Sequence, residues 1–169
     1  MGPRSAVVQG SFFNSFVYSV CRALSERCGK PEAEKILTRF GELLFGEIRA
    51  QRAIDLADPL ATLRSIADYL VASGYMAKID IAEVDKLVYT IDMFGGPAHD
   101  SSQRLIAEGH APSHVLTNTM FAALSAMGLR ATLEHLDVSD PANTRERWQL
   151  TEVQQSMAID TGSSEEAQQ

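Results

Sequence analysis

The chain has 169 residues, of which 45% are hydrophobic and 22% are charged, and its formal net charge is −7. These values are typical of one soluble globular domain with a sizeable core, and they argue against wholesale disorder. The acidic balance argues against nucleic acid and anionic membranes as main partners, because binding phosphate requires a concentrated positive field.

The first third of the chain predicts a short arm and a long apolar helix. Residues 1–10 are expected to form a mobile arm, and the apolar spacing predicts a helix over residues 11–27 that stops at Gly29. A helix that is apolar on most sides lies either at the centre of a core or between subunits. The apolar side chains of this segment are Phe12, Phe13, Phe16, Val17, Tyr18, Val20, Cys21 and Leu24.

The cysteines and the apolar run of the same segment indicate the cellular compartment of the protein. Cys21 and Cys28 are two helical turns apart, about 10.5 Å along the axis, which is too far for a disulfide. Two reduced thiols are typical of a cytoplasmic protein. The apolar run 12–20 is too short to span a bilayer, and no secretion signal precedes it. We therefore expect a cytoplasmic protein without a membrane segment.

Two further helices follow. The second begins at Pro31 and contains Gly41 and Gly46, each of which costs about 1 kcal/mol relative to alanine inside a helix. Two such glycines indicate that another element packs closely there, and we favour a helix over a bound ligand. The third helix starts with the N-cap Asp58 and with Pro59 at its first position, and it ends at Gly74.

The hydrophobic period then changes from helical to alternating. Residues 77–81 and 87–93 alternate apolar and polar side chains, which predicts an antiparallel hairpin linked by residues 83–86. Four polar residues would share its solvated face, namely Lys78, Asp80, Thr90 and Asp92.

The second half of the chain predicts one more helix and one more hairpin. Residues 94–113 form a long connection, and such loops are functional lids or contain a short helix, here over 102–107. A helix over 113–127 follows, and 130–138 with 147–153 predict two strands. The polar residues 154–169 are expected to be a mostly disordered tail. We predict a single α+β domain over 11–153, with helices on one face of a small antiparallel sheet of two hairpins, in the order ααα-ββ-α-ββ.

The four histidines lie in the second half and are the candidates for catalysis or metal binding. His110 and His114 have the spacing that two ligands on one helix face require, although Pro112 in the first turn weakens that arrangement. His99 and Asp100 are the candidate acid–base pair, against the simpler interpretation of polar surface residues.

Other catalytic signatures are absent from the sequence. No Gly-x-Ser-x-Gly element presents a nucleophile, and the Gly95-Gly96-Pro97 segment opens no phosphate-binding loop. No motif therefore requires a cofactor, and the missing nucleophile and phosphate-binding motifs argue against an enzyme.

Aromatic residues and methionines remain, and they would either fill the core or line an apolar pocket, since methionine adapts to varied ligands. The candidate ligand-binding residues are Phe16, Phe40, Tyr69, Tyr89, Met93, His114 and Phe121.

The order of elements carries a resemblance to a known family. A helix ending in Gly74-Tyr75, an amphipathic hairpin, a polar loop, a helix rich in Ala, Leu and Phe, and a terminal strand pair resemble the four-vinyl-reductase-type domain. That domain is grouped with the haem-NO-binding and Golgi-transport proteins. The resemblance spans 31–153 and rests mainly on 58–75 and 114–129.

This resemblance implies a protein that binds a small hydrophobic molecule or serves as an assembly subunit, and that dimerises. Many members carry a cysteine or histidine near the start of the last helix, a place that His110 and His114 occupy here. The cysteines that members carry near the C-terminal strands are missing, so the resemblance supports neither the metal site of the family nor a reductase activity.

Our hypothesis from the sequence is a homodimer that binds a small apolar or aromatic molecule between helices and sheet, as a sensor, carrier or accessory subunit. One alternative is an enzyme that uses His99, His110 or His114 for acid–base or metal chemistry. The other is a protein-interaction subunit whose first helix is buried by a partner.

Overall fold

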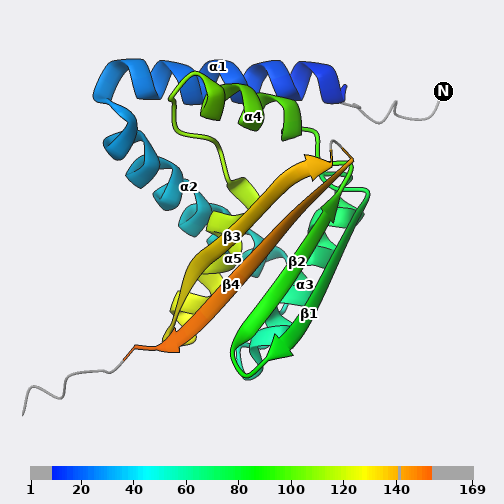
Figure 1. Ribbon diagram of the computed structural model, residues 1–169. Coiled ribbons are helices and arrows are strands. Elements are labelled where there is room, and N and C mark those ends of the chain that lie inside the picture. Colours follow the sequence, from blue (N-terminus) through cyan, green and yellow to red (C-terminus); the bar gives the residue numbers. More distant parts are fainter. Residues whose placement is uncertain (1–8, 141, 154–169) are drawn as a thin grey trace, which may run out of the picture.

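The computed structural model describes residues 9–140 and 142–153. Figure 1 shows a sheet with two helices behind it and a helical layer across one of its ends. The elements are α1 (Gly10–Cys28), α2 (Lys30–Gln51), α3 (Pro59–Ala72), β1 (Lys78–Asp85), β2 (Val88–Phe94), α4 (His99–Ala107), α5 (Val115–Ala126), β3 (Leu129–Asp140) and β4 (Asn143–Glu152).

The two predicted hairpins are confirmed, and they join into one antiparallel sheet with the strand order β1-β2-β4-β3. Asp80 pairs with Asp92 across the first hairpin, so the four polar residues of that hairpin share one face, as predicted. On the same face Arg145 of β4 lies opposite Asp92, and its Nε donates to Oδ1 of that residue at 2.6 Å.

The main core lies between the other face of the sheet and the helices α3 and α5 (Figure 1). Alternation along β4 turns Trp148 and Leu150 inward, and Trp148 meets Phe121 of α5 edge to face at 4.8 Å between ring centroids. The largest fully buried apolar side chains are Trp148, Tyr89, Ile48, Leu63, Ile66, Ile91, Leu105, Met120, Leu124 and Leu150.

A second, smaller hydrophobic cluster holds α1, the start of α2 and α4 together. The long connection after β2 contains α4, which confirms the predicted short helix and starts it at His99 instead of Ser102. The element order otherwise matches the prediction. The residues of the second cluster are Val17, Cys21, Ala33, Leu37, Ala98, Leu105 and Ala111.

Helix α1 is not at the centre of the core, so that alternative from the sequence is wrong. Only Val17, Cys21 and Ser25 are buried on it. Phe12 and Phe16 are 65% and 55% exposed, because α4 and α2 cover one side of the helix and leave the other open.

Several boundaries differ from the predicted ones. Gly10, assigned to the arm, is the first residue of α1, while the rest of that arm up to residue 8 and the tail 154–169 lie outside the described residues. Strand β1 continues to Asp85, so Lys86 and Leu87 form the turn. Cys21 and Cys28 are free, as expected. In the described part of the chain, no helix is long and apolar enough to cross a bilayer.

One of the two interior glycines of α2 marks a close helix contact. A Cβ at Gly41 would lie 2.6 Å from the backbone carbonyl carbon of Asn118 in α5, while a Cβ at Gly46 would meet no atom within 4 Å. The Nδ2 of Asn118 also donates to the carbonyl oxygen of Leu37 at 3.2 Å. The neighbour that the glycines predicted is therefore a helix, and Gly41 alone permits its approach.

We expect Gly41→Ala and Gly46→Ala to change stability in opposite directions. At Gly41 the added methyl group collides with a backbone that cannot yield, which should destabilise the fold by about 1–3 kcal/mol. At Gly46 the site is open and the gain in helix propensity should stabilise by up to about 1 kcal/mol. Urea denaturation of both variants measures this, and equal shifts would contradict the α2–α5 contact.

Candidate functional site

A cavity of about 580 Å³ lies between the inner face of the sheet, α1, α4 and the start of α5. The sheet contributes Met93 of β2, Thr144 and Glu146 of β4, and Leu136 and Val138 of β3. The other walls are the first turns of α1, the helix α4, and the start of α5. This volume lies within the range of about 300–1,000 Å³ that small-molecule sites occupy.

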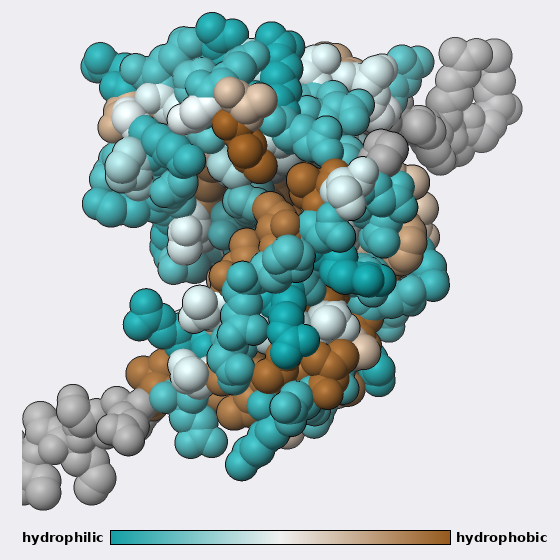
Figure 2. Space-filling model, viewed as in Figure 1, coloured by the Kyte–Doolittle hydropathy of each residue, from teal (hydrophilic) through white to brown (hydrophobic). Residues whose placement is uncertain are grey.

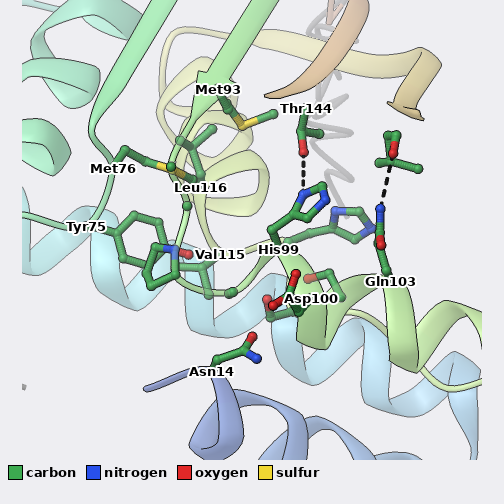
Figure 3. A pocket seen from close by; sticks show the side chains of 18 of the residues that line it. Asn14, Tyr75, Met76, Met93, His99, Asp100, Gln103, Val115, Leu116 and Thr144 are labelled. Atoms are coloured by element: carbon green, nitrogen blue, oxygen red, sulfur yellow. Dashed lines mark hydrogen bonds between the residues drawn. The ribbon is translucent and has the colours of Figure 1, made fainter. Parts of the chain in front are cut away.

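One wall of the cavity is apolar. Figure 3 shows Tyr75, Met76, Met93 and Leu116 gathered on one side of His99. The ring of Tyr75 meets Phe13 of α1 edge to face at 5.9 Å, and burial, followed by the nearby Cys21, raises the Tyr75 pKa to about 12. These side chains offer a polarisable, adaptable surface to an apolar ligand.

Two glycines allow this wall to form. Gly95 has a φ of +66°, in the left-handed region that glycine favours, and a Cβ there would lie 2.9 Å from the Cβ of Ala77. A Cβ at Gly96 would lie 2.9 Å from the Sδ of Met76. Glycine is thus needed at positions 95 and 96 because the chain packs closely there against Ala77 and Met76, which follow α3.

The opposite side of the cavity is polar. The Nδ1 of His99 lies 3.0 Å from the Oγ1 of Thr144, a hydrogen bond drawn in Figure 3. The Nε2 of His99 and the Oδ1 of Asn143 are buried and have no hydrogen-bond partner among the described residues. Both residues line the cavity, but these two atoms have almost no accessible surface, so a ligand would reach them only after a side chain moves.

A buried carboxyl group stands beside these atoms. Glu146 is 2% exposed, and it accepts hydrogen bonds from the Oγ1 of Thr117 at 2.9 Å and from the Nε1 of Trp148 at 2.7 Å. Burial raises the pKa of this carboxyl, while the two hydrogen bonds act in the opposite direction. No motif in the sequence points to Glu146, although its place two residues before Trp148 on a strand puts it on the inner face.

His114 is held at the start of α5 in an unusual conformation. Its φ of 41° lies in the left-handed region, which costs a residue other than glycine of the order of 1 kcal/mol. Burial lowers the pKa of its imidazole, with a smaller opposing effect of Glu34. The side chain that lines the cavity is therefore mostly uncharged at neutral pH.

The structure brings together some of the predicted site residues. Met93, His114, His99 and Asp100 all line the cavity. The His99 ring is hydrogen-bonded to Thr144 of β4. The acid–base role of His99 and Asp100 stays a prediction.

The remaining ligand-binding candidates lie away from this cavity. Phe16 and Phe40 are about half exposed on α1 and α2. Tyr89 is buried in the main core, and the hydroxyl of Tyr69 donates to the Oε1 of Gln51. Phe121 packs on Trp148 and borders a separate pocket of about 340 Å³. Their role in binding stays a prediction.

The metal candidates do not share a helix face. His110 precedes α5, and its Nε2 lies 4.0 Å from the Oε2 of Glu108, whereas His114 caps α5. Over residues 9–140 and 142–153, no group of three or more histidine, cysteine, aspartate or glutamate side chains could hold a metal ion. A metal on His110 and His114 stays a prediction from spacing.

Comparisons with known proteins identify the fold. No family model and no curated protein sequence matches the chain. A solved structure does match, that of a trafficking protein particle complex subunit 3 from Naegleria fowleri covalently bound to palmitic acid, with a TM-score of 0.61 and 16% identity. The match covers 85% of this chain and 95% of that one. The chain therefore shares its fold with that subunit, while the four-vinyl-reductase-type label stays a prediction.

The raised pKa of Glu146 predicts a specific dependence of stability on pH. A carboxyl whose pKa is higher in the folded than in the unfolded state favours folding below the unfolded pKa, and that contribution is lost as pH rises through the folded pKa. Wild type should therefore lose stability relative to Glu146→Gln as pH rises above about 4.5, the ordinary value of this group. Chemical denaturation from pH 4 to 9 measures the difference.

The matched control is Glu152→Gln, at the exposed end of the same strand. The difference in stability between wild type and Glu152→Gln should not fall with rising pH in this way. Parallel profiles for wild type and Glu146→Gln would show that burial does not penalise the charged carboxyl.

Proposed function

We propose that this chain is an accessory subunit that binds a small molecule with an apolar body in the cavity between the sheet, α1, α4 and α5. The observation that carries the proposal is the division of the cavity into an apolar wall around Met76 and Met93 and a polar wall with His99, Asn143 and Thr144. A mostly apolar pocket with a few converging polar groups is the usual form of a small-molecule site.

The ligand would be bound without a covalent bond. The solved structure of similar fold is of a protein covalently bound to palmitic acid. The two cysteines of this chain both lie on α1, and neither lines the cavity. Burial also raises the pKa of the Cys21 thiol to about 11, which keeps it in the unreactive thiol form.

The segment between β2 and α5 would serve as the cover of this site. Helix α4 forms one wall, and it is fixed to α1 because the Ser101 N–H donates to the Oδ1 of Asn14 at 2.9 Å. The Ala111 N–H likewise donates to the Oγ of Ser25 at 3.0 Å. The predicted lid would thus be held by α1, so opening of the site would require these contacts to break.

Filling the cavity should weaken binding. Val115→Trp places a large ring at the start of α5 in the cavity wall, and it should weaken binding of the uncharged dye Nile red at least about tenfold. Fluorescence titration measures the dissociation constant, and native mass spectrometry of freshly purified wild type reports any bound molecule.

Val84→Trp is the control, because Val84 is half exposed on β1 and lies outside the cavity. It should bind the dye as wild type does. Equal loss in both variants, or full binding by Val115→Trp, would contradict this site.

We further propose that the chain assembles as a homodimer through the exposed sides of α1 and α2. Phe12, Phe16 and Val20 recur at helical spacing on α1, and all three are exposed. Exposed apolar side chains that gather in a stripe are typical of interaction surfaces. On α2 the corresponding exposed residues are Ile36, Phe40 and Leu43. An assembly of this kind fits a cytoplasmic accessory subunit.

Phe16→Glu should dissociate the homodimer. A buried charge at the centre of an apolar interface would weaken association by at least about tenfold, while the fold remains because Phe16 is half exposed in the single chain. Sedimentation equilibrium measures the dissociation constant, and Val84→Glu on β1 is the matched control. A monomeric wild type at micromolar concentration would contradict the homodimer.

A further inference from the structure

The cavity and the exposed apolar stripe of α1 share one short segment, residues 10–16 at the start of that helix. The side chains of Phe12 and Phe16 belong to the stripe and are more than half exposed. Residues between them in the sequence face the cavity instead, because positions three and four apart on a helix lie on the same side. The cavity-lining residues of this segment are Gly10, Ser11, Asn14 and Ser15.

This segment begins without the usual stabilising groups of a helix N-terminus. The first N–H groups of a helix have no partner within the helix, and a side-chain cap or a nearby acidic residue normally compensates them. Gln9 stands at the N-cap position, and its side chain makes no capping hydrogen bond. The first turn contains no acidic residue. The start of α1 therefore opens more readily than a capped helix would.

Few contacts hold the segment against the rest of the chain. The Oδ1 of Asn14 accepts the Ser101 N–H at 2.9 Å, and the ring of Phe13 meets Tyr75 edge to face at 5.9 Å. All three buried residues of α1 come later in the helix, from Val17 onward. Few buried contacts and exposed backbone ends are the marks of low local stability. This wall of the cavity is therefore the least firmly held part of α1.

We propose that assembly with a second copy completes the cavity. Burial of Phe12 and Phe16 against the partner holds the start of α1 in place, so the dimer binds a ligand more tightly than the single chain does. A site that is formed in only a fraction of the molecules loses affinity by that fraction. Ligand binding strengthens assembly by the same factor, because coupling between two binding equilibria is reciprocal. This inference rests on the proposed function, on both the ligand site and the homodimer.

The test breaks the dimer from the other helix, away from the cavity. Phe40 is half exposed in the stripe of α2 and does not line the cavity. At a concentration where the wild type is dimeric, full-length Phe40→Glu should be monomeric by sedimentation equilibrium. Its dissociation constant for Nile red, from fluorescence titration, should be at least about threefold weaker than that of the wild type. Val84→Glu is the control and should bind the dye as the wild type does. Leu43→Glu, on the same stripe, repeats the test with a second exposed position.

A second change separates the start of α1 from other effects of dissociation. Gln9→Ser introduces a favoured N-cap, which stabilises the first turn without any partner. Added to Phe40→Glu, it should tighten Nile red binding at least about twofold while the chain stays monomeric.

The possible results distinguish this inference from the proposed function. A monomeric Phe40→Glu that binds the dye as tightly as the dimeric wild type would overturn the coupling and leave the ligand site and the homodimer standing. Should the wild type bind no dye or remain monomeric, the proposed function fails and the inference fails with it. Weakened binding that Gln9→Ser does not recover would overturn the role of the start of α1.

Discussion

The close contact between α2 and α5 at Gly41 determines how the rest of the molecule is arranged. Because Gly41 has no side chain, the backbone at Asn118 can lie directly on α2. Helix α2 takes part in both hydrophobic clusters, with Phe45 in the main core and Ala33 and Leu37 in the cluster with α1 and α4. Fixing α2 on α5 therefore also fixes the distance between the α1–α4 layer and the sheet. The cavity is the space that this distance leaves.

The cavity wall carries polar groups that a packed core would not tolerate. Glu146 and Thr144 occupy inner positions of β4, on the same side as Trp148 and Leu150. A buried carboxyl is unfavourable unless hydrogen bonds compensate it, and Thr117 and Trp148 supply them here. The unpaired atoms of His99 and Asn143 have no such compensation among the described residues. Groups held at such a cost cluster at functional sites more often than elsewhere.

The likeness to a trafficking-complex subunit concerns the fold, because only 16% of the aligned residues are identical. A fold hosts many functions, and the function resides in the residues placed on it. In this chain two features are distinct. One is a cavity with an apolar and a polar wall, and the other is the set of exposed apolar residues on α1 and α2. Figure 2 shows apolar residues gathered in the middle of one face, with polar residues around them. The proposed accessory subunit would use the cavity for its ligand and the exposed stripes for assembly.

The sequence by itself determined the helices, the hairpins and their order. Those features depend on local periods and caps, such as Asp58, whose Oδ1 accepts the Ala61 N–H at 2.6 Å. It also pointed to Met93 and His99, which line the cavity. Only the tertiary structure decided that β2 and β4 are neighbours, that α1 is half exposed, and that Glu146 faces a cavity. These depend on contacts between residues far apart in the chain, and neither a local period nor a residue type specifies which distant surface will cover a given face.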